Sequence, residues 1–152
     1  MAALFHNVRS TYNVGALLRT ADGAGAAKIY LTGITPTPID RFGRTDKSIS
    51  KTALGAETTV PWEYANNPNT VIKKLRAEGW AIVGVEQDAR SVDYRAFKTK
   101  KPILFVFGNE VRGLSPTLRR QCDALVEIPM RGEKESLNVS VAAGIILFNF
   151  SN

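Results

Sequence analysis

The sequence predicts an α/β protein built on a mainly parallel β-sheet, and three observations support this fold class. Short aliphatic and β-branched runs alternate along the chain with segments of helical periodicity. The segment PILFVFG (102–108) is apolar without interruption, which is typical of a strand covered by helices on both faces. No repeat, low-complexity tract or linker interrupts the chain, so we expect a single domain over residues 1–152, with no separate second domain.

The first elements are two strands with a helix between them. The strands are expected at residues 2–5 and 27–33. The apolar residues of the helix recur with the spacing i, i+3, i+4, i+7, which places them on one buried face. These residues are Val14, Leu17, Leu18 and Ala21.

Later elements are expected in the same alternation. A helix over residues 70–78 has Asn69 as its expected N-cap and Gly79 as its end. Residues 34–57 form the one long segment without a regular pattern, and loops of this length are usually functional or disordered. The other expected elements are a strand at 80–85, the strand at 102–108, a helix over 115–121, a strand at 124–130 and a final helix from about Ser136.

Composition limits the classes of function. The net charge of +6 and the pI near 9.7 favour an anionic partner, with nucleic acid ahead of a membrane surface. Charge alone leaves open a basic protein that is merely soluble. The single Cys122 and single His6 exclude an internal disulfide, a cysteine metal cage and most zinc or Ser/His/Asp chemistry, so no metal is expected. Without a signal-peptide pattern or a membrane span, the expected location is the cytoplasm.

Polar residues gather after the predicted strands. In open α/β sheets, ligands bind outside the carboxyl ends of the strands. The sequence therefore predicts one functional edge of the sheet. The segments that follow the strands are HNVRSTYN (6–13), EQDAR (86–90), GNEVRG (108–113) and PMRGEKESLN (129–138).

The usual nucleotide-binding motifs are not found at this edge. The sequence contains no P-loop pattern. GAGAAK (23–28) has the glycine spacing with which a dinucleotide fingerprint starts, but it follows a helix and precedes a strand. Because that order is the reverse of the one a dinucleotide site requires, we interpret the segment as a turn.

Three segments resemble the sequence motifs of the SpoU (TrmH-like) RNA 2′-O-ribose methyltransferases, part of the SPOUT superfamily. They are NVGALLRTADGAGAAKIYLTG (13–33), FGNEVRGLS (107–115) and IPMRGEKESLNVSVAAGI (128–145), in the order of the family. A shorter segment, SKTALGAE (50–57), also resembles a family element. Three ordered motifs are far more specific than any one of them.

The resemblance implies several properties that composition and periodicity do not. The family fold is an α/β sheet whose C-terminal segment is threaded into a deep trefoil knot. Its members act as homodimers and bind S-adenosylmethionine, in a bent shape, in the knot. The implied reaction is methyl transfer to a ribose 2′-hydroxyl in tRNA or rRNA.

The motif NxGxxxR places Arg19 as the leading catalytic candidate. On the helix Arg19 lies roughly 150° from the apolar stripe and is expected to face away from the core. Because a guanidinium is effectively always protonated, we prefer a role in binding the adjacent phosphate and stabilising alkoxide charge over a role as a base. Asn13 is either a helix cap or a residue that positions Arg19 or the ribose. Glu110 either pairs with Arg112 or, as the resemblance implies, orients Arg19 or lines the RNA site.

The final motif and two strand ends supply the expected cofactor site. Ser136 is interpreted as a helix cap or a cofactor contact, and Asn138 as a donor at the catalytic centre. By analogy with the family, backbone groups at four positions bind S-adenosylmethionine, and Met130 lines the pocket. The four positions are Val85, Gly108, Ile128 and Leu137.

The expected RNA contacts lie in the long segment after the second strand. Phe42 is a candidate for stacking on a base, surrounded by cationic residues that suit a phosphate backbone. The cationic residues are Arg41, Arg44, Lys47 and Lys51. A second basic segment, RSVDYRAFKTKK (90–101), is a weaker candidate, because such runs are usually solvated faces.

The function expected from these observations is S-adenosylmethionine-dependent methylation of a ribose 2′-hydroxyl in RNA. The alternative is a small RNA-binding module that kept the fold and lost catalysis. Two other interpretations have less support. A methyltransferase acting on a base nitrogen fits the ribose-type motifs less well, and a flavodoxin-like nucleotide binder leaves the motifs unexplained.

Overall fold

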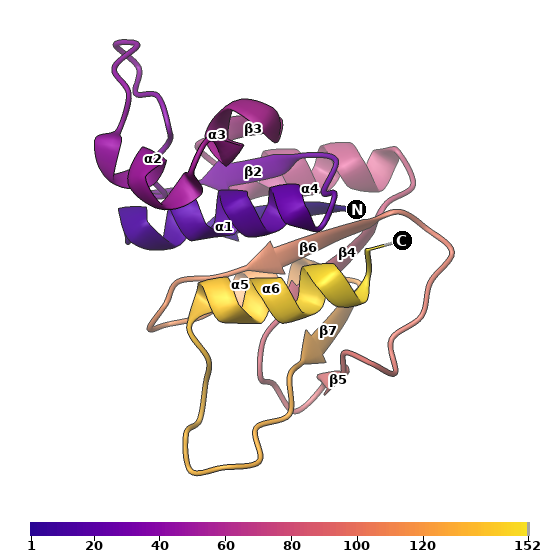
Figure 1. Cartoon of the computed structure of the whole chain (residues 1–152). Coiled ribbons are helices and arrows are strands. Elements are labelled where there is room, and N and C mark those ends of the chain that lie inside the picture. The colour runs from indigo at the N-terminus through magenta and orange to yellow at the C-terminus, as the bar shows by residue number, and fades with distance from the viewer. Residues whose placement is uncertain (152) are drawn as a thin grey trace.

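A computed structural model describes residues 1–151, which form a seven-stranded, fully parallel sheet with helices on both faces (Figure 1). The strand order is β3-β2-β1-β6-β4-β7-β5. The predicted fold class is therefore confirmed, whereas the C-terminal knot stays a prediction from the resemblance. The strands are β1 (Ala2–His6), β2 (Ile29–Thr32), β3 (Trp62–Ala65), β4 (Ala81–Val85), β5 (Val92–Asp93), β6 (Ile103–Phe107) and β7 (Ala124–Glu127).

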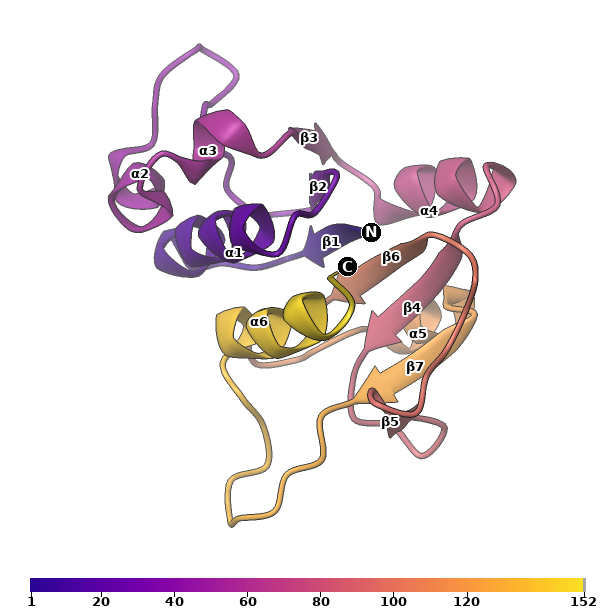
Figure 2. The same ribbon diagram turned by 45° about the vertical axis from the view of Figure 1, so that its right-hand side comes forward.

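Helices cover the two faces of the sheet unequally. In Figure 1, α1 and α6 lie in front of the sheet, and α4 and α5 lie behind it. Figure 2 shows α1 and α6 side by side, in agreement with their packing contacts. The helices are α1 (Thr11–Gly23), α2 (Lys47–Ala53), α3 (Ala56–Thr59), α4 (Pro68–Ala77), α5 (Pro116–Gln121) and α6 (Val139–Asn149).

Alternation along the strands builds two cores. Ala3 and Phe5 of β1 join the larger cluster, which includes residues of α1 and α6, whereas Leu4 joins the smaller cluster under α4 and α5. All five residues of β6 are buried, as the uninterrupted apolar run predicts. The four residues that predict the buried face of α1 are also fully buried.

Two helices begin at other residues than the sequence predicts. Asn67, and not Asn69, is the N-cap of α4, because Pro68 takes the first helical position, where its fixed φ suits a helix start. The predicted start of the last helix near Ser136 is also wrong. The helix begins at Val139, and Asn138 is its N-cap through a 2.8 Å hydrogen bond from the Ser140 backbone N–H.

The segment 34–57 was expected to lack regular structure, and this expectation is wrong for its second half. Asp46 accepts hydrogen bonds from the backbone N–H groups of Ser48 and Ile49 and starts α2, and the short helix α3 follows. Helix α2 has only seven residues, too few to show a clear apolar stripe in the sequence. Burial of Ile49 and Ala53 against α1 stabilises it. Strands β3 and β5 were also not predicted, because β3 is partly exposed and β5 has two residues.

Gly15 allows α2 to approach α1 closely. A Cβ atom at this position would lie 1.9 Å from the Thr52 Oγ1 atom and 2.5 Å from the carbonyl oxygen of Ile49. The glycine of the NxGxxxR motif therefore has a packing role: it fixes the helix that follows the long loop onto the helix that carries Asn13 and Arg19.

We expect Gly15→Ala to lower the free energy of unfolding by about 1–3 kcal/mol, because the added methyl group overpacks the contact between α1 and α2. Gly144→Ala in α6 is the matched control, since its Cβ would meet the Thr20 Cγ2 atom at an ordinary 3.7 Å. That control should be neutral or stabilising, because alanine has the higher helix propensity. Urea unfolding followed by circular dichroism at one protein concentration measures both; equal effects would contradict the packing role.

Candidate active site

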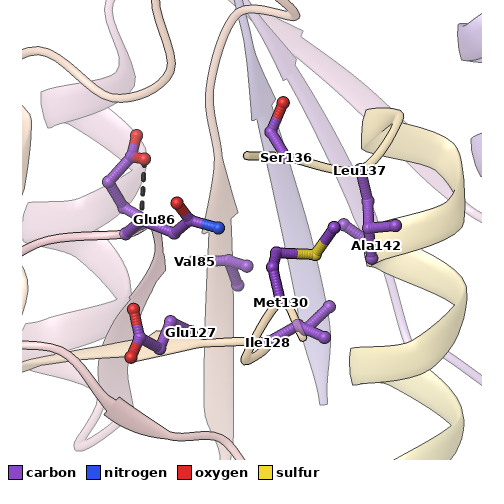
Figure 3. A pocket seen from close by; sticks show the side chains of 9 residues that line it. Val85, Glu86, Glu127, Ile128, Met130, Ser136, Leu137 and Ala142 are labelled. Atoms are coloured by element: carbon purple, nitrogen blue, oxygen red, sulfur yellow. Dashed lines mark hydrogen bonds between the residues drawn. The ribbon is translucent and has the colours of Figure 1, made fainter. Parts of the chain in front are cut away.

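The carboxyl ends of β4, β6 and β7 and the connection 128–138 surround a pocket. Figure 3 shows its two sides: Met130, Leu137 and Ala142 lie opposite the carboxylates of Glu86 and Glu127. The apolar wall faces a polar one, on which the backbone N–H groups of Leu114 and Gln87 hold the Glu86 carboxylate. Its lining residues are Val85, Glu86, Gln87, Glu127, Ile128, Met130, Ser136, Leu137 and Ala142.

The residues expected to bind the cofactor lie together around this pocket. Val85, Ser136 and Leu137 also line the adjoining hollow, in which Gly108 and Glu110 lie. The backbone of Gly113 lies directly against Gly108, because a Cβ atom on Gly108 would lie 2.3 Å from the carbonyl carbon of Gly113. The turn after β6 thus folds back onto the end of its own strand.

Glu110 joins the end of β6 to the start of α1. Its carboxylate accepts hydrogen bonds from the backbone N–H groups of Arg9 (2.9 Å) and Ser10 (3.0 Å) and from the Asn13 side-chain amide (3.4 Å). Burial raises the pKa of Glu110, but the N–H groups of Ser10 and Arg9 and the Asn13 amide outweigh this effect and hold the pKa below its ordinary value. Pairing with Arg112, one of the two sequence interpretations, is not the contact that the carboxylate makes.

Asn13 and Asn138 extend this arrangement to the last helix. Ser10 is the N-cap of α1, so the interpretation of Asn13 as a cap is wrong; Asn13 is a buried residue of the first turn. The Asn138 side-chain N–H donates to the Asn13 side-chain oxygen at 3.3 Å. Glu110, Asn13 and Asn138, from three distant segments, therefore form one hydrogen-bonded line beside the pocket.

Arg19 lies apart from this line. It is exposed, as predicted, and lines a separate hollow with Tyr12, Lys51 and Phe148. The hydrogen bonds of Glu110 go to residues 9–13 and Asn109, and not to Arg19. Within one chain, the expected orientation of Arg19 by Glu110 does not occur.

The expected RNA-binding residues lie on two elements. Phe42 is exposed at the tip of a turn, with the guanidinium groups of Arg41 and Arg44 at 4.8 Å and 5.0 Å from its ring centre. Lys47 and Lys51 are exposed on α2. The second basic segment differs, because its aromatic residues Tyr94 and Phe97 pack against the core.

Glu86, Gln87, Glu127 and Ala142 line the pocket but were not predicted as site residues. Glu86 accepts a 2.7 Å hydrogen bond from the backbone N–H of Leu114, and the Gln87 side-chain amide donates to the carbonyl oxygen of Glu135 at 2.6 Å. Glu86 and Gln87 follow β4, and Glu127 ends β7. These positions could have identified them as site residues, because ligands of a parallel sheet bind at its carboxyl side.

A comparison with known families adds independent support. The model of the SpoU rRNA Methylase family matches residues 1–148. The chain belongs to this family. The resemblance found in its three motifs is thereby confirmed.

Curated relatives of this SpoU chain are named 23S rRNA (guanosine-2′-O-)-methyltransferase RlmB. The protein of Ralstonia nicotianae is 40% identical over 141 residues, which cover 93% of this chain and 54% of that protein. The protein of Vibrio parahaemolyticus is 39% identical over the same shares. The SpoU chain thus spans about half the length of the curated relatives it matches.

Solved structures of SpoU proteins have the same fold. AviRb of Streptomyces viridochromogenes, in complex with AdoMet, matches with a TM-score of 0.87 and 28% identity over 98% of this chain and 58% of that one. An AdoMet-bound rRNA methyltransferase of Sinorhizobium meliloti matches with a TM-score of 0.87 and 35% identity, over 97% of this chain and 54% of that one.

Two further observations concern residues 1–151 of this SpoU chain. No helix in this range has the length and apolar character needed to cross a membrane. In the same range, no three histidine, cysteine, aspartate or glutamate side chains come together in a group that could hold a metal ion.

We expect Glu110→Gln to lower stability near neutral pH and to flatten its dependence on acid pH. An amide replaces one acceptor oxygen by a donor, and an unsatisfied buried N–H costs about 1–3 kcal/mol. Because the folded-state pKa of Glu110 lies below its ordinary 4.5, its contribution is fully present above that pH and is lost as the pH falls through the folded pKa. Urea unfolding between about pH 6 and pH 3 measures the slope.

Glu133→Gln, at an exposed position of the connection 128–138, is the control for this experiment. The control should keep both the stability and the acid slope of the parent chain. A Glu110→Gln variant as stable as the parent at pH 7, or with an unchanged acid slope, would show that the carboxylate does not hold α1 in place.

Proposed function

We propose that this chain transfers a methyl group from S-adenosylmethionine to a ribose 2′-hydroxyl of RNA, with S-adenosylhomocysteine as the leaving group and the hydroxyl proton released to water. The observation that carries the proposal is the line Glu110–Asn13–Asn138, which brings the three SpoU motifs together beside one pocket. The family, the names of the relatives and the AdoMet complexes of two neighbours support it. Because the curated relatives are named for 23S rRNA, we infer rRNA ahead of tRNA as substrate and the cytoplasm as location.

The pocket at the ends of β4 and β7 fits S-adenosylmethionine chemically. This molecule carries a sulfonium, an ammonium, a carboxylate and a flat adenine. The pocket offers an apolar wall at Met130 and Leu137 to the adenine, and the acidic residues Glu86 and Glu127 lie on the opposite side. Backbone groups at Val85, Gly108, Ile128 and Leu137 and the hydroxyl of Ser136 lie around it as candidate donors and acceptors. When bound, the cofactor supplies an already activated methyl group, so no metal is required.

The residues around the reaction centre position the ribose rather than take its proton. Asn13 and Asn138 are neutral amides, and Glu110 is an ionised carboxylate that several N–H donors already occupy. Such a carboxylate is a poor base, but it fixes the Asn13 amide. The Asn138 amide spans two elements, because its oxygen accepts from the Ser140 N–H while its N–H group reaches Asn13.

Arg19 requires a different explanation, because it lies outside the pocket of its own chain. It belongs to a face on which α1 and α6 expose apolar side chains, including Tyr12, Val141 and Phe148. Helix α6 is apolar on all sides, which is typical of a helix that is buried all round. We infer a homodimer that covers this face, and a site in which Arg19 of one chain serves the pocket of the other by binding phosphate and stabilising alkoxide charge.

The reaction itself is the first test. The purified chain, labelled S-adenosylmethionine and unmodified total RNA should yield a labelled 2′-O-methylated nucleoside after digestion, identified by mass spectrometry. Arg19→Ala should lower the rate at least about a hundredfold, as expected for loss of a transition-state charge partner, whereas Arg19→Lys should keep part of it.

The outcomes of this test separate the alternatives. Loss of activity in Arg19→Lys as complete as in Arg19→Ala would contradict a role as a simple cation and favour bidentate or basic use of the guanidinium. If neither transfer nor S-adenosylmethionine binding is found, the proposal fails, and the RNA-binding module becomes the better explanation.

The dimer is tested by Phe148→Glu. Phe148 is 54% exposed, and we expect a buried charge there to convert the dimer into a monomer and abolish methyl transfer while S-adenosylmethionine binding is kept. Phe42→Glu, at a 66% exposed phenylalanine on the distant turn, is the matched control and should stay dimeric. Sedimentation velocity measures both; a monomeric parent chain would contradict the inference.

A further inference from the structure

A second groove lies on the same carboxyl side of the sheet, at its β2–β3 end. Its floor is the edge strand β3 and its rim is the loop between β2 and α2, which stands away from the body of the molecule beyond α2 in Figures 1 and 2. Residues from both elements line it, including Ile34, Ile39, Arg41, Arg44, Trp62 and Tyr64. Arg41 and Arg44 are expected RNA contacts, whereas Trp62 and Tyr64 have no role in the function described above.

The floor of the groove is aromatic and held in place. Trp62 and Tyr64 are alternate residues of β3 and therefore lie on the same face of the strand. Trp62 packs against the core, whereas Tyr64 is 44% exposed. The Tyr64 hydroxyl donates a 2.8 Å hydrogen bond to the carbonyl oxygen of Gly33, which holds the ring in place. Ile34 adds an apolar side chain that is 64% exposed.

The rim is rigid and carries charges of both signs, because Asp40 and Asp46 line it beside Arg41 and Arg44. Asp40 accepts hydrogen bonds from the backbone N–H groups of Phe42 and Arg44, both at 2.9 Å, and from the Arg44 side chain at 2.8 Å. An antiparallel bridge between Ile39 and Thr45 closes the turn at its base. The turn therefore holds both guanidinium groups at the groove without having to order on binding, which lowers the entropic cost of binding. Arg44 is already paired with Asp40, whereas Arg41 forms no ion pair within residues 1–151.

Exposed aromatic surface beside fixed guanidinium groups is the chemistry that binds a nucleotide. Every base has a flat face that stacks on an aromatic ring, and the adjacent phosphate pairs with arginine. A protein partner would have to desolvate the Arg41 guanidinium, whereas a phosphate backbone neutralises it. The net charge of +6 favours the same partner.

Hydrogen bonds connect the groove to the candidate active site. The Asn7 side-chain oxygen accepts from the backbone N–H of Ile34 at 3.0 Å, and the Asn7 carbonyl oxygen accepts from the Asn109 amide at 2.9 Å. Asn109 directly precedes Glu110. Strand β2 is three strand positions from β4, or roughly 14 Å, so one RNA strand along this edge reaches both places.

We propose that the groove between β3 and the loop 33–46 binds an unpaired nucleotide of the RNA substrate next to the methylated one, with its base on Tyr64 and Trp62 and its phosphate on Arg41 and Arg44. This inference rests on the proposed function and adds a subsite to it. The subsite selects single-stranded RNA, because a base inside a duplex does not offer its face to the groove.

The test uses the fluorescence of Trp62. Trp80, the other tryptophan, lies against the smaller core, so Trp80→Phe leaves Trp62 as the single reporter. The full chain with this substitution is titrated with single-stranded hexa-adenylate and with an abasic ribose-phosphate hexamer of the same charge. We expect hexa-adenylate to quench Trp62 and to bind more tightly than the abasic hexamer.

Substitutions at Tyr64 then separate base stacking from charge. Tyr64→Ala should weaken hexa-adenylate binding about tenfold and leave the abasic hexamer unchanged, whereas Tyr64→Phe keeps the ring and should bind as the parent does. Arg44→Gln should weaken both ligands equally, because both carry the phosphates. Equal binding of the two hexamers, no change of Trp62 fluorescence or equal losses in Tyr64→Ala would overturn the subsite.

S-Adenosylmethionine binding, measured by calorimetry on the same protein, distinguishes this inference from the proposed function. Cofactor binding without a base-dependent response of Trp62 would overturn the groove and leave methyl transfer standing. A base-dependent response without cofactor binding would support the groove and overturn the methyltransferase.

Discussion

The position of β6 between β1 and β4 is the constraint on which the rest of the structure depends. This strand comes late in the chain, yet it pairs with the first strand and is buried along its whole length. Its insertion sets the turn that carries Glu110 next to residues 9–13, which lie about a hundred positions earlier. The sheet centre and the candidate active site therefore depend on the same non-local pairing, which costs loop-closure entropy.

The chemical character of the site follows from this arrangement. Hydrogen bonds from N–H groups hold an ionised carboxylate, and the carboxylate in turn orients a neutral amide. Preorganised polar groups of this kind stabilise charge without reorganising during the reaction. The same need for order explains why Asn138 ends the long connection 128–138: as the cap of α6 it cannot rotate without leaving a helix N–H unpaired.

The sequence predicts best where local pattern and burial agree. The stripe through Leu17 and Leu18 and the uninterrupted run of β6 specify their elements without help from distant residues. The sequence predicts less well where contacts between distant residues determine whether an element forms or where it begins. Helix α2 depends on Gly15 of another helix, β3 is an edge strand, and the start of α6 is set by a side chain that also reaches Asn13. Residues such as Glu127 are ordinary in sequence and acquire a role only through the strand order.

The close contact at Gly15 has a mechanical consequence. With no side chain between them, α1 and α2 pack as one rigid unit. This unit carries the turn with Phe42, which precedes α2, and it carries Asn13 and Arg19 on α1. Under the proposed function, RNA bound at the turn therefore acts on the position of α1, because no flexible joint lies between the two helices. If the turn binds RNA as proposed, binding there is coupled to the placement of Arg19, so an RNA of the wrong shape is expected to lose reaction rate as well as affinity.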